Sequence, residues 1–271
     1  KTSEIKFKPN HLLPKNLNDF DNYGYTPLHY AASLGTPEII NLFVNLGANV
    51  NQDSAERLPD SKRGETPLHT AARYGNPQNI EALIKAGANI EAKNDNGYTP
   101  FLLALSGEKP ENVKVLLKRG ANKFVLNSRN ETALHLASRS IHCSITCDLL
   151  IKKGFSIKSE DIEGNRPLHN ALKFGLAGTA GIKVLLDAGA KINEQNKLGK
   201  TPFHLALSRI VVDYKQIELL LAAGANINIK DNQGKTPLDI AKIYNSKGYL
   251  KFHKALTKTI KDLKKSKKYL Y

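Results

Sequence analysis

Short apolar stretches with helical spacing alternate along the chain with glycines and with turns rich in asparagine and aspartate. Ile39, Ile40, Phe43 and Val44 form one such stretch, and residues 80–84 form a second with the same spacing. Apolar residues three and four positions apart lie on one face of a helix. The pattern therefore predicts a series of short amphipathic helices.

A nine-residue signal recurs down the chain, in its fullest form GYTPLHYAA at 24–32. Its threonine position falls at residues 26, 66, 99, 132, 166, 201 and 236, in steps of 33 to 40 residues. A second signal, typified by GANVN from Gly47, follows each of the first six copies after 21 to 23 residues. The sequence thus contains six full repeats and a seventh, terminal one.

Each part of the signals has a physical role in a helix pair. The threonine caps the first helix by accepting hydrogen bonds from free N–H groups, and the following proline suits the first helical position. A glycine such as Gly47 ends the second helix in a left-handed conformation, and a turn such as Asn-Asp-Asn-Gly at 94–97 follows. Where the turn glycine is replaced, by Asn130, the substitute tolerates that backbone conformation. Stacking buries faces that a single pair would expose.

A period of about 33 residues with T-P-L-H at its front is typical of ankyrin repeats. The chain resembles an ankyrin-repeat protein from about residue 21 to residue 245. The resemblance implies an all-α ankyrin-repeat α-solenoid of stacked helix-turn-helix units with projecting β-hairpin-like loops. About seven repeats are expected, starting near 21, 61, 94, 127, 161, 196 and 231. Residues 1–20 are expected to form an N-terminal cap, and residues 246–271 a Lys-rich C-terminal capping helix and tail.

Three departures from the repeat pattern need separate interpretation. The first connection is longer than the others, and its polar segment 51–63 is either a solvated loop or a finger that contacts a partner. Glycines between residues 175 and 181 favour a flexible turn. Arg166 replaces the capping threonine, at an expected cost of about 1 kcal/mol, and Ala133 replaces the proline. We therefore expect the fourth and fifth repeats to be the less stable part of the array.

The composition is that of a folded chain. Of 271 residues 41% are hydrophobic and 24% charged, with a formal net charge of +15, which excludes wholesale disorder. No apolar run approaches the ~20 residues of a membrane-spanning helix. Two cysteines and no secretory leader favour a reducing, cytoplasmic location. Because the chain starts at Lys1 and contains no methionine, we expect it to be a piece of a longer protein.

The histidines do not indicate an active site. Five of them occupy the fourth position of the T-P-L-H motif, one in each of five repeats, so they do not converge as catalytic groups must. The resemblance implies that this histidine bonds the backbone and the threonine hydroxyl to brace the helix start. The motif residues are Thr26, His29, Thr66, His69, Thr99, Thr132, His135, His169, Thr201, His204 and Thr236.

One local group contains residue types that bind metals: His142, Cys143 and Cys147. Its spacing does not match a four-ligand zinc site, so we expect the two cysteines to be buried or idle. A phosphate-binding G-x-x-x-x-G-K loop, a G-x-S-x-G elbow and an H-E-x-x-H motif are all absent from the sequence. We therefore expect no enzymatic activity, no metal and no cofactor.

The excess positive charge belongs to the C-terminal segment. From Lys242 to Tyr271 there are ten lysines and one acid, Asp262. Apolar residues in this segment are spaced like one stripe of a helix. The segment is either a solvated capping helix or an electrostatic handle for acidic protein, anionic lipid or nucleic acid. Nothing in it favours base-specific recognition.

In the ankyrin family, binding residues lie at the loop tips and near the ends of the first helices, on a concave face. Tyrosine and arginine, which are enriched at binding hot spots, occupy many of these positions here. The expected partner-binding residues are Tyr23, Tyr25, Leu34, Arg63, Arg73, Tyr74, Tyr98, Arg129, Arg139, Phe174, Lys200, Arg209, Lys235 and Tyr244. Aromatic residues come first and basic residues later, which indicates a partner with an apolar end and an acidic end.

The sequence therefore predicts a non-catalytic scaffold, expected to be a monomer, that binds another protein. Two alternatives remain open: a targeting module of a larger enzyme whose catalytic domain is absent from this chain, or an adaptor for anionic membrane or nucleic acid through the basic tail. The Lys/Asn/Ile-rich composition also resembles ankyrin proteins of intracellular bacteria, which act as effectors inside host cells. That resemblance would place the chain in the host cytosol.

Overall fold

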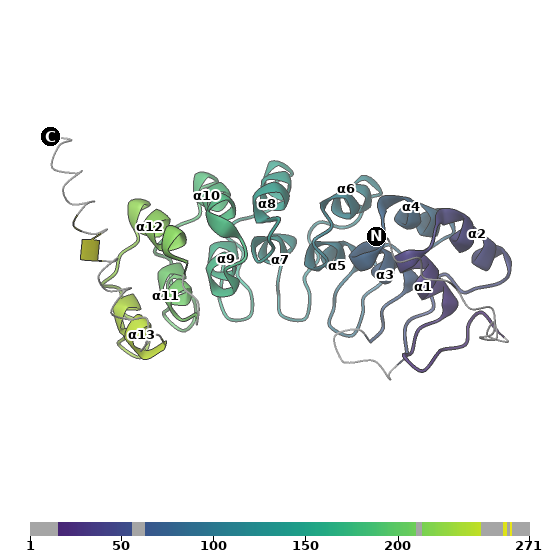
Figure 1. Cartoon of the computed structure of the whole chain (residues 1–271), viewed down its shortest axis with the longest axis horizontal. Helices are drawn as coiled ribbons and strands as arrows, with labels where there is room; N and C mark the ends of the chain where they lie inside the picture. The colour runs from purple at the N-terminus through teal and green to yellow at the C-terminus, as the bar shows by residue number, and fades with distance from the viewer. Residues whose placement is uncertain (1–15, 56–62, 210–212, 245–256, 259–260, 262–271) are drawn as a thin grey trace, which may run out of the picture. The chain divides into compact units, whose positions relative to one another are not determined.

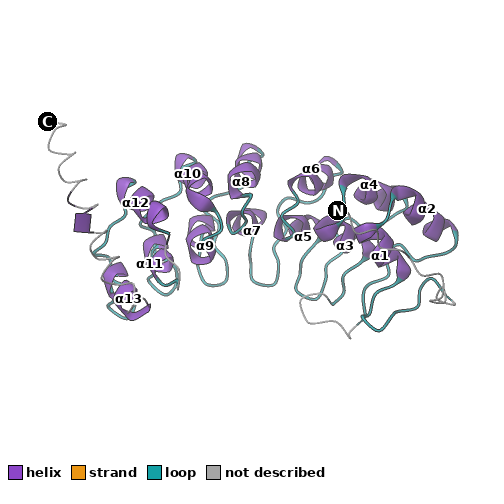
Figure 2. Cartoon of the chain, in the orientation of Figure 1, coloured by secondary structure: helices purple, strands orange, loops and turns teal. Residues whose placement is uncertain are grey.

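The computed structural model describes residues 16–55, 63–209, 213–244, 257–258 and 261. Within these residues the regular structure is helical and no strand occurs (Figure 2). The helices of the described part of the chain are α1 (Pro27–Leu34), α2 (Pro37–Asn45), α3 (Pro67–Tyr74), α4 (Pro77–Lys85), α5 (Pro100–Ser106), α6 (Pro110–Lys118), α7 (Ala133–Ser138), α8 (Cys143–Lys152), α9 (Pro167–Phe174), α10 (Gly178–Asp187), α11 (Pro202–Leu207), α12 (Tyr214–Ala222) and α13 (Pro237–Tyr244).

The chain divides into two compact parts, an N-terminal unit, Lys1–Asn122, and a C-terminal unit, Lys123–Tyr271. In the N-terminal unit α1, α3 and α5 pack side by side in one layer, and α2, α4 and α6 in a second. In the C-terminal unit α7, α9, α11 and α13 form the first layer, and α8, α10 and α12 the second. Long loops project beside the first layer of each unit (Figure 1). The expected all-α stack of helix pairs is confirmed.

The helices begin and end where the repeated signals predict. Six of the seven first helices in the described residues begin with proline, and α7, which begins with Ala133, is the exception. The glycines that follow the second helices have φ between 82° and 95°, a left-handed backbone that side chains resist. Asn130 has a φ of 55°, so the residue that replaces a turn glycine adopts the expected conformation.

The projecting loops are tight turns held by an Asn or Asp side chain. In the third repeat, Asn94 Oδ1 accepts hydrogen bonds from the N–H groups of Asn96 and Tyr98, at 3.1 and 2.9 Å. The Asn94 N–H in turn donates to the Tyr98 carbonyl, at 3.0 Å. Single backbone bonds join neighbouring loops, such as that from the Asp95 N–H to the Arg63 carbonyl, at 3.2 Å. The loops are therefore hairpin-like, as expected, without being strands.

The apolar side chains of the helices form the core between the two layers. Leu28 and Leu68 of the first layer and Ile40, Ile80 and Leu83 of the second are fully buried. Burying one such side chain contributes about 1.5–3 kcal/mol relative to leaving it exposed. The stacked faces therefore supply the core that one helix pair cannot form.

The glycine-rich segment 175–181 differs from its prediction as a flexible turn. Helix α10 begins at Gly178, so the turn is confined to residues 175–177. Gly181 is buried, and a Cβ there would lie 2.6 Å from Cys143 Sγ. This glycine therefore permits close packing of α10 on α8. Residues 1–15, 56–62 and most of 245–271 lie outside the described residues, and with them the predictions for the N-terminal cap, the inserted loop and the basic tail.

Candidate functional site

A contact between threonine and the histidine three residues later holds the start of the first helix; we call it the Thr–His clamp. In the first repeat the Thr26 N–H and hydroxyl both lie against His29 Nδ1, at 3.2 and 2.8 Å. The Nε2 atom of the same ring lies 2.8 Å from the carbonyl oxygen of Glu65, in the second repeat. Because a carbonyl only accepts hydrogen bonds, Nε2 carries the hydrogen and Nδ1 accepts.

The Thr–His clamp recurs in the second, fourth and sixth repeats, with Oγ1–Nδ1 distances of 2.8 to 2.9 Å. Its members there are Thr66 with His69, Thr132 with His135 and Thr201 with His204. In each case Nε2 reaches a carbonyl oxygen of the following repeat, at Tyr98, Asn165 or Lys235. The motif residues therefore fix the helix start and also join neighbouring repeats within each unit.

Two repeats replace the histidine with another residue. In the third, Leu102 stands in its place, and the Thr99 hydroxyl oxygen accepts a hydrogen bond from the Leu102 N–H at 3.4 Å. In the seventh, the Thr236 hydroxyl donates to the Asp239 carboxylate at 2.7 Å, and the Thr236 N–H donates to the same oxygen at 3.1 Å. The carboxylate thus accepts the two bonds that a ring nitrogen accepts elsewhere.

The fifth repeat replaces the threonine by Arg166. The Arg166 N–H still donates to His169 Nδ1, at 3.2 Å, so only the hydroxyl contact is lost. The guanidinium forms ion pairs with Glu160 and Glu194, at 3.1 and 3.2 Å. Glu194 also pairs with Lys191, at 3.2 Å, beside a pocket of about 170 Å³. Two of the three cations that line this pocket, Arg166 and Lys191, are paired with carboxylates, which offsets part of its positive charge.

The motif histidines are structural, neutral groups. Burial lowers the pKa of His29, His69 and His169 to about 4. Burial also lowers the pKa of His135 and His204. Each ring belongs to its own repeat, and both of its nitrogen atoms lie within hydrogen-bond distance of backbone groups. Among the described residues, no group of three or more His, Cys, Asp or Glu side chains is placed to hold a metal ion.

Buried amides link the second helix of one repeat to the first helix of the repeat before it. Asn79 Nδ2, in α4, donates to the carbonyls of Ala32 and Gly35 at the end of α1, at 3.1 and 3.0 Å. Asn112, in α6, makes the same contacts with the end of α3. These amides satisfy carbonyls that a helix end leaves unpaired. Sequence reasoning missed them, although both occur one residue before a buried apolar position of their helices.

Two glutamates at the loop tips are buried and paired with predicted partner-binding arginines. Glu65 is fully buried, and its carboxylate lies 3.1 Å from Arg73 Nη1. Glu131 is also buried, and it pairs with Arg139 Nη1 at 3.0 Å. Sequence reasoning missed both glutamates, and their recurrence eight residues before an arginine was the available signal. These two arginines therefore have an internal role in addition to any role in binding.

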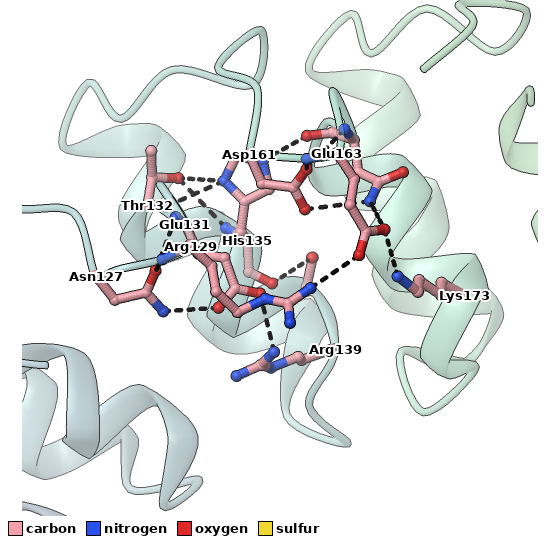
Figure 3. A network of polar contacts seen from close by, with 11 residues as sticks. Asn127, Arg129, Glu131, Thr132, His135, Arg139, Asp161, Glu163 and Lys173 are labelled. Atoms are coloured by element: carbon pink, nitrogen blue, oxygen red, sulfur yellow. Dashed lines mark hydrogen bonds and ion pairs between the residues drawn. The ribbon is translucent and has the colours of Figure 1, made fainter. Parts of the chain in front are cut away.

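A network of polar contacts surrounds the second of these pairs (Figure 3). Asn127 Nδ2 donates to the Glu131 carboxylate at 2.7 Å. Glu163, from the fifth repeat, accepts from Arg129 Nη2 of the fourth repeat at 2.9 Å and from Lys173 Nζ at 2.6 Å. The hydrogen bond with Lys173 is the largest factor that lowers the pKa of Glu163. Arg129 thus has an ion-pair partner inside the molecule, which reduces the positive charge of the loop surface that carries it.

Tyrosines gather at the first two repeats of the N-terminal unit. The Asp21 carboxylate accepts hydrogen bonds from the N–H groups of Tyr23 and Tyr25 and from the Tyr30 hydroxyl. The Tyr25 and Tyr30 rings meet edge to face with centroids 5.8 Å apart. Burial, followed by the interactions with Glu65 and Tyr74, raises the pKa of Tyr25 to about 12. Tyr74 of the second repeat therefore interacts electrostatically with Tyr25 of the first.

The other predicted partner-binding residues are distributed along both units. Leu34, at the end of α1, is 83% exposed. Phe174 is exposed, and the Arg139 guanidinium lies 5.3 Å from its ring centroid. The half-buried members of the set are Arg63, Tyr98, Lys200, Arg209 and Lys235. The side chain of Tyr244 lies outside the described residues.

The two cysteines lie together one turn apart on α8. Both are free and buried, and their Sγ atoms are 3.2 Å apart. The hydrogen bond with Cys143 and burial together raise the pKa of the Cys147 thiol. A protonated thiol is neither a good nucleophile nor a metal ligand. The prediction that these cysteines are buried is confirmed.

Comparisons with known proteins agree with this geometry. The family model "Ankyrin repeats (3 copies)" matches residues 53–126, 102–196 and 177–265, and "Ankyrin repeat" matches residues 23–55. A search of curated protein sequences gives no match. Among solved structures, the human ASB11 ankyrin repeat domain is 26% identical with a TM-score of 0.71, and the match covers 87% of this chain and 98% of that one.

The ankyrin repeat domain of Bcl-3, described as a unique member of the IκB family, is 30% identical with a TM-score of 0.60. That match covers 80% of this chain and 94% of the Bcl-3 chain. None of the described helices is both long and apolar enough to cross a membrane. Ankyrin repeats generally mediate protein–protein interaction and are typically non-catalytic. The repeated clamps, the paired helix layers and these matches show that the chain belongs to the ankyrin-repeat family.

Proposed function

We propose that this chain binds a partner protein through the surface formed by the loop tips and the first helices of its repeats, and that it does so without catalysis. The observation that carries the proposal is the gathering of exposed and half-exposed tyrosines at the first two repeats. Tyr23 is 71% and Tyr74 44% exposed, and Tyr74 interacts electrostatically with Tyr25. Tyrosine provides a large contact area at a small entropic cost, which is why it is common in binding surfaces.

The Thr–His clamps support this function by holding the surface in place before binding. The tips that carry Tyr25 and Tyr98 are joined to neighbouring repeats through clamp and backbone hydrogen bonds. A surface that is already ordered loses little conformational entropy when a partner binds. The same clamps supply no reactive group, because their histidines are neutral and fully bonded.

Site-specific photo-crosslinking in cell lysate tests the location of the binding surface. A benzophenone amino acid replaces Tyr74 or Leu34 in the full chain, and Ile145, which is exposed on the second-layer helix α8, provides the control. We expect one discrete protein adduct from the Tyr74 and Leu34 positions and none from Ile145. Adducts of equal yield from Ile145 would contradict the proposal.

A surface variant provides a second measurement on the same partner. In the triple variant Tyr25→Ala, Tyr74→Ala, Tyr98→Ala, we expect at least a tenfold loss of affinity for the crosslinked protein. Tyr214→Ala is the control, because Tyr214 is exposed on α12 in the second layer of the C-terminal unit. Circular dichroism checks that both variants keep their helices. Unchanged affinity in a folded triple variant would place the binding surface elsewhere.

A further inference from the structure

The first repeat has a charge opposite to that of the chain as a whole. Residues 16–55 contain four carboxylates, Asp19, Asp21, Glu38 and Asp53, and no lysine or arginine, whereas the full chain has a formal net charge of +15. Asp21 and Asp53 both interact electrostatically with His29, which places them near the same loop tip. Residues 16–55 are therefore acidic, whereas residues 1–15 carry four lysines and one glutamate.

One of these carboxylates is fixed among three tyrosines. Asp21 Oδ1 accepts from the N–H groups of Tyr23 and Tyr25, at 2.9 and 3.0 Å. Asp21 Oδ2 accepts from the Tyr30 hydroxyl at 2.5 Å. Because the carboxylate is held by three donors, its position relative to the rings is set before any ligand arrives. We call Asp21, Tyr23, Tyr25 and Tyr30 the first-repeat cluster.

The rings of the first-repeat cluster are accessible and suitably arranged for a cation. Tyr23 is 71% and Tyr30 41% exposed, and the Tyr25 and Tyr30 rings are tilted by 74°. Perpendicular rings offer one face and one edge to the same space, and the face of an aromatic ring attracts cations. A phenol that donates its hydrogen bond to a carboxylate has an electron-richer ring, which strengthens that attraction.

The cation that this arrangement favours is not supplied by the repeat itself. The neighbouring Arg73, from the second repeat, is held by the Glu65 carboxylate and lies 5.7 Å from the Tyr74 ring centroid. The first-repeat cluster thus combines aromatic faces with a fixed negative charge, and residues 16–55 contain no basic side chain to neutralise it.

We propose that the first-repeat cluster binds a cationic segment, bearing arginine or lysine, of the partner protein. This inference rests on the proposed function and names the chemistry of the partner at one end of the surface. It differs from the sequence-based expectation of an apolar contact there. Acidic protein, nucleic acid and anionic membrane are disfavoured at this place, because their charges repel the carboxylates.

The test compares two labelled peptides that differ only in charge. Fluorescence anisotropy measures binding of the full chain to an Arg-Ser repeat peptide and to its citrulline-Ser counterpart, in which a neutral group of the same shape replaces each guanidinium. We expect the arginine peptide to bind at least tenfold more tightly, with an affinity that falls as salt rises. Equal affinity for the two peptides would overturn the proposal.

Two substitutions locate the peptide on the first-repeat cluster. Asp21→Asn removes the charge but keeps an oxygen for the Tyr23 and Tyr25 amides, as Asn94 does in the third repeat. Its matched control is Asp231→Asn, at the same loop position of the seventh repeat, where Oδ1 accepts two equivalent amide bonds. We expect at least a threefold loss of affinity from Asp21→Asn and none from Asp231→Asn.

Tyr23→Ala tests the contribution of the aromatic rings to peptide binding. Tyr214→Ala is the control, because Tyr214 is also an exposed tyrosine but lies outside the first-repeat cluster. We expect at least a threefold weakening from the first and no change from the second. Equal losses from a test variant and its control would show non-specific charge or surface effects and would reject the first-repeat cluster as the site.

The lysine-rich C-terminal segment of a second copy is the competing source of cations. Two measurements distinguish this source from a partner protein. An unlabelled peptide with the sequence of residues 261–271 competes with the labelled arginine peptide, and light scattering of the full chain detects dimers. Displacement by this peptide together with concentration-dependent dimers would assign the site to a second copy and overturn the partner assignment. If the charge preference is absent while crosslinking at Tyr74 persists, the cationic partner is rejected and the proposed function stands.

Discussion

Glu65 is fully buried at a loop tip and forms a 3.1 Å ion pair with Arg73, eight residues later in the same repeat. The same arrangement occurs between Glu131 and Arg139, at 3.0 Å. The first and third repeats fill these two positions with Tyr25 and Ser33 and with Tyr98 and Ser106. The first four repeats therefore carry one of two combinations at these positions, one charged and one neutral.

The two combinations predict that a second substitution can restore the stability lost through a first one. Arg73→Ser removes the ion-pair partner of a buried carboxylate, and we expect it to lower the free energy of unfolding by about 3 kcal/mol. Adding Glu65→Tyr creates the combination found in the first and third repeats and removes the buried charge. Urea denaturation followed by circular dichroism should show most of the loss recovered. A double variant no more stable than Arg73→Ser would contradict this interpretation.

The clamp histidines predict that the protein loses stability in mild acid. His29, His69 and His169 have a pKa of about 4 in the folded chain against an ordinary value of 6.5. Between these values the unfolded chain binds more protons than the folded chain, so stability is complete above pH 6.5 and falls as the pH approaches 4. Each such histidine contributes on the order of 3 kcal/mol across this window.

His69→Leu isolates one of these contributions, because the third repeat carries Leu102 at the same position. We expect the variant to be less stable at pH 7, where the clamp is lost, but less sensitive to pH between 6.5 and 4. Denaturant unfolding at several pH values measures both effects. A dependence as steep as that of the unmodified chain would show that other groups govern acid unfolding.

The buried amide of Asn79 predicts that aspartate at this position destabilises the fold more than alanine does. Asn79→Ala removes the donor for the Ala32 and Gly35 carbonyls and should cost about 1–3 kcal/mol. Asn79→Asp should cost more, since it places a carboxylate against carbonyl oxygens. Asn45→Ala, at the exposed end of α2, is the control and should change stability by no more than about 0.5 kcal/mol. Equal effects of alanine and aspartate at position 79 would exclude the amide donor as the cause.

The burial of the two cysteines predicts that their thiols react with a thiol reagent only when the protein unfolds. Cys143 and Cys147 are fully buried free thiols joined by a hydrogen bond, and the raised pKa of Cys147 keeps that thiol protonated. Titration with a thiol reagent at pH 7.5 should detect no rapid reaction in the native protein and two equivalents in urea. Rapid native labelling would show that this part of α8 opens readily.

The repeat architecture could be read from the sequence because its signals are local. A threonine before proline starts a helix, and a glycine such as Gly47 stops one, through contacts within a few residues. Their recurrence predicted the helix pairs and the turn at Asn130. The exposure of Tyr23 and Leu34 also follows from their positions in the repeat.

Contacts between repeats could not be read in this way. Whether Glu65 is buried depends on the neighbouring helices, and Asn79 finds its carbonyl partners in residues more than forty positions earlier in the chain. The pairing of Arg129 with Glu163 likewise needs two loops to lie side by side. The sequence determined which local structures form, because their energies depend on adjacent residues. Only the tertiary structure decided which polar groups are paired and which remain available to a partner, because burial and ion pairing depend on distances between separate repeats.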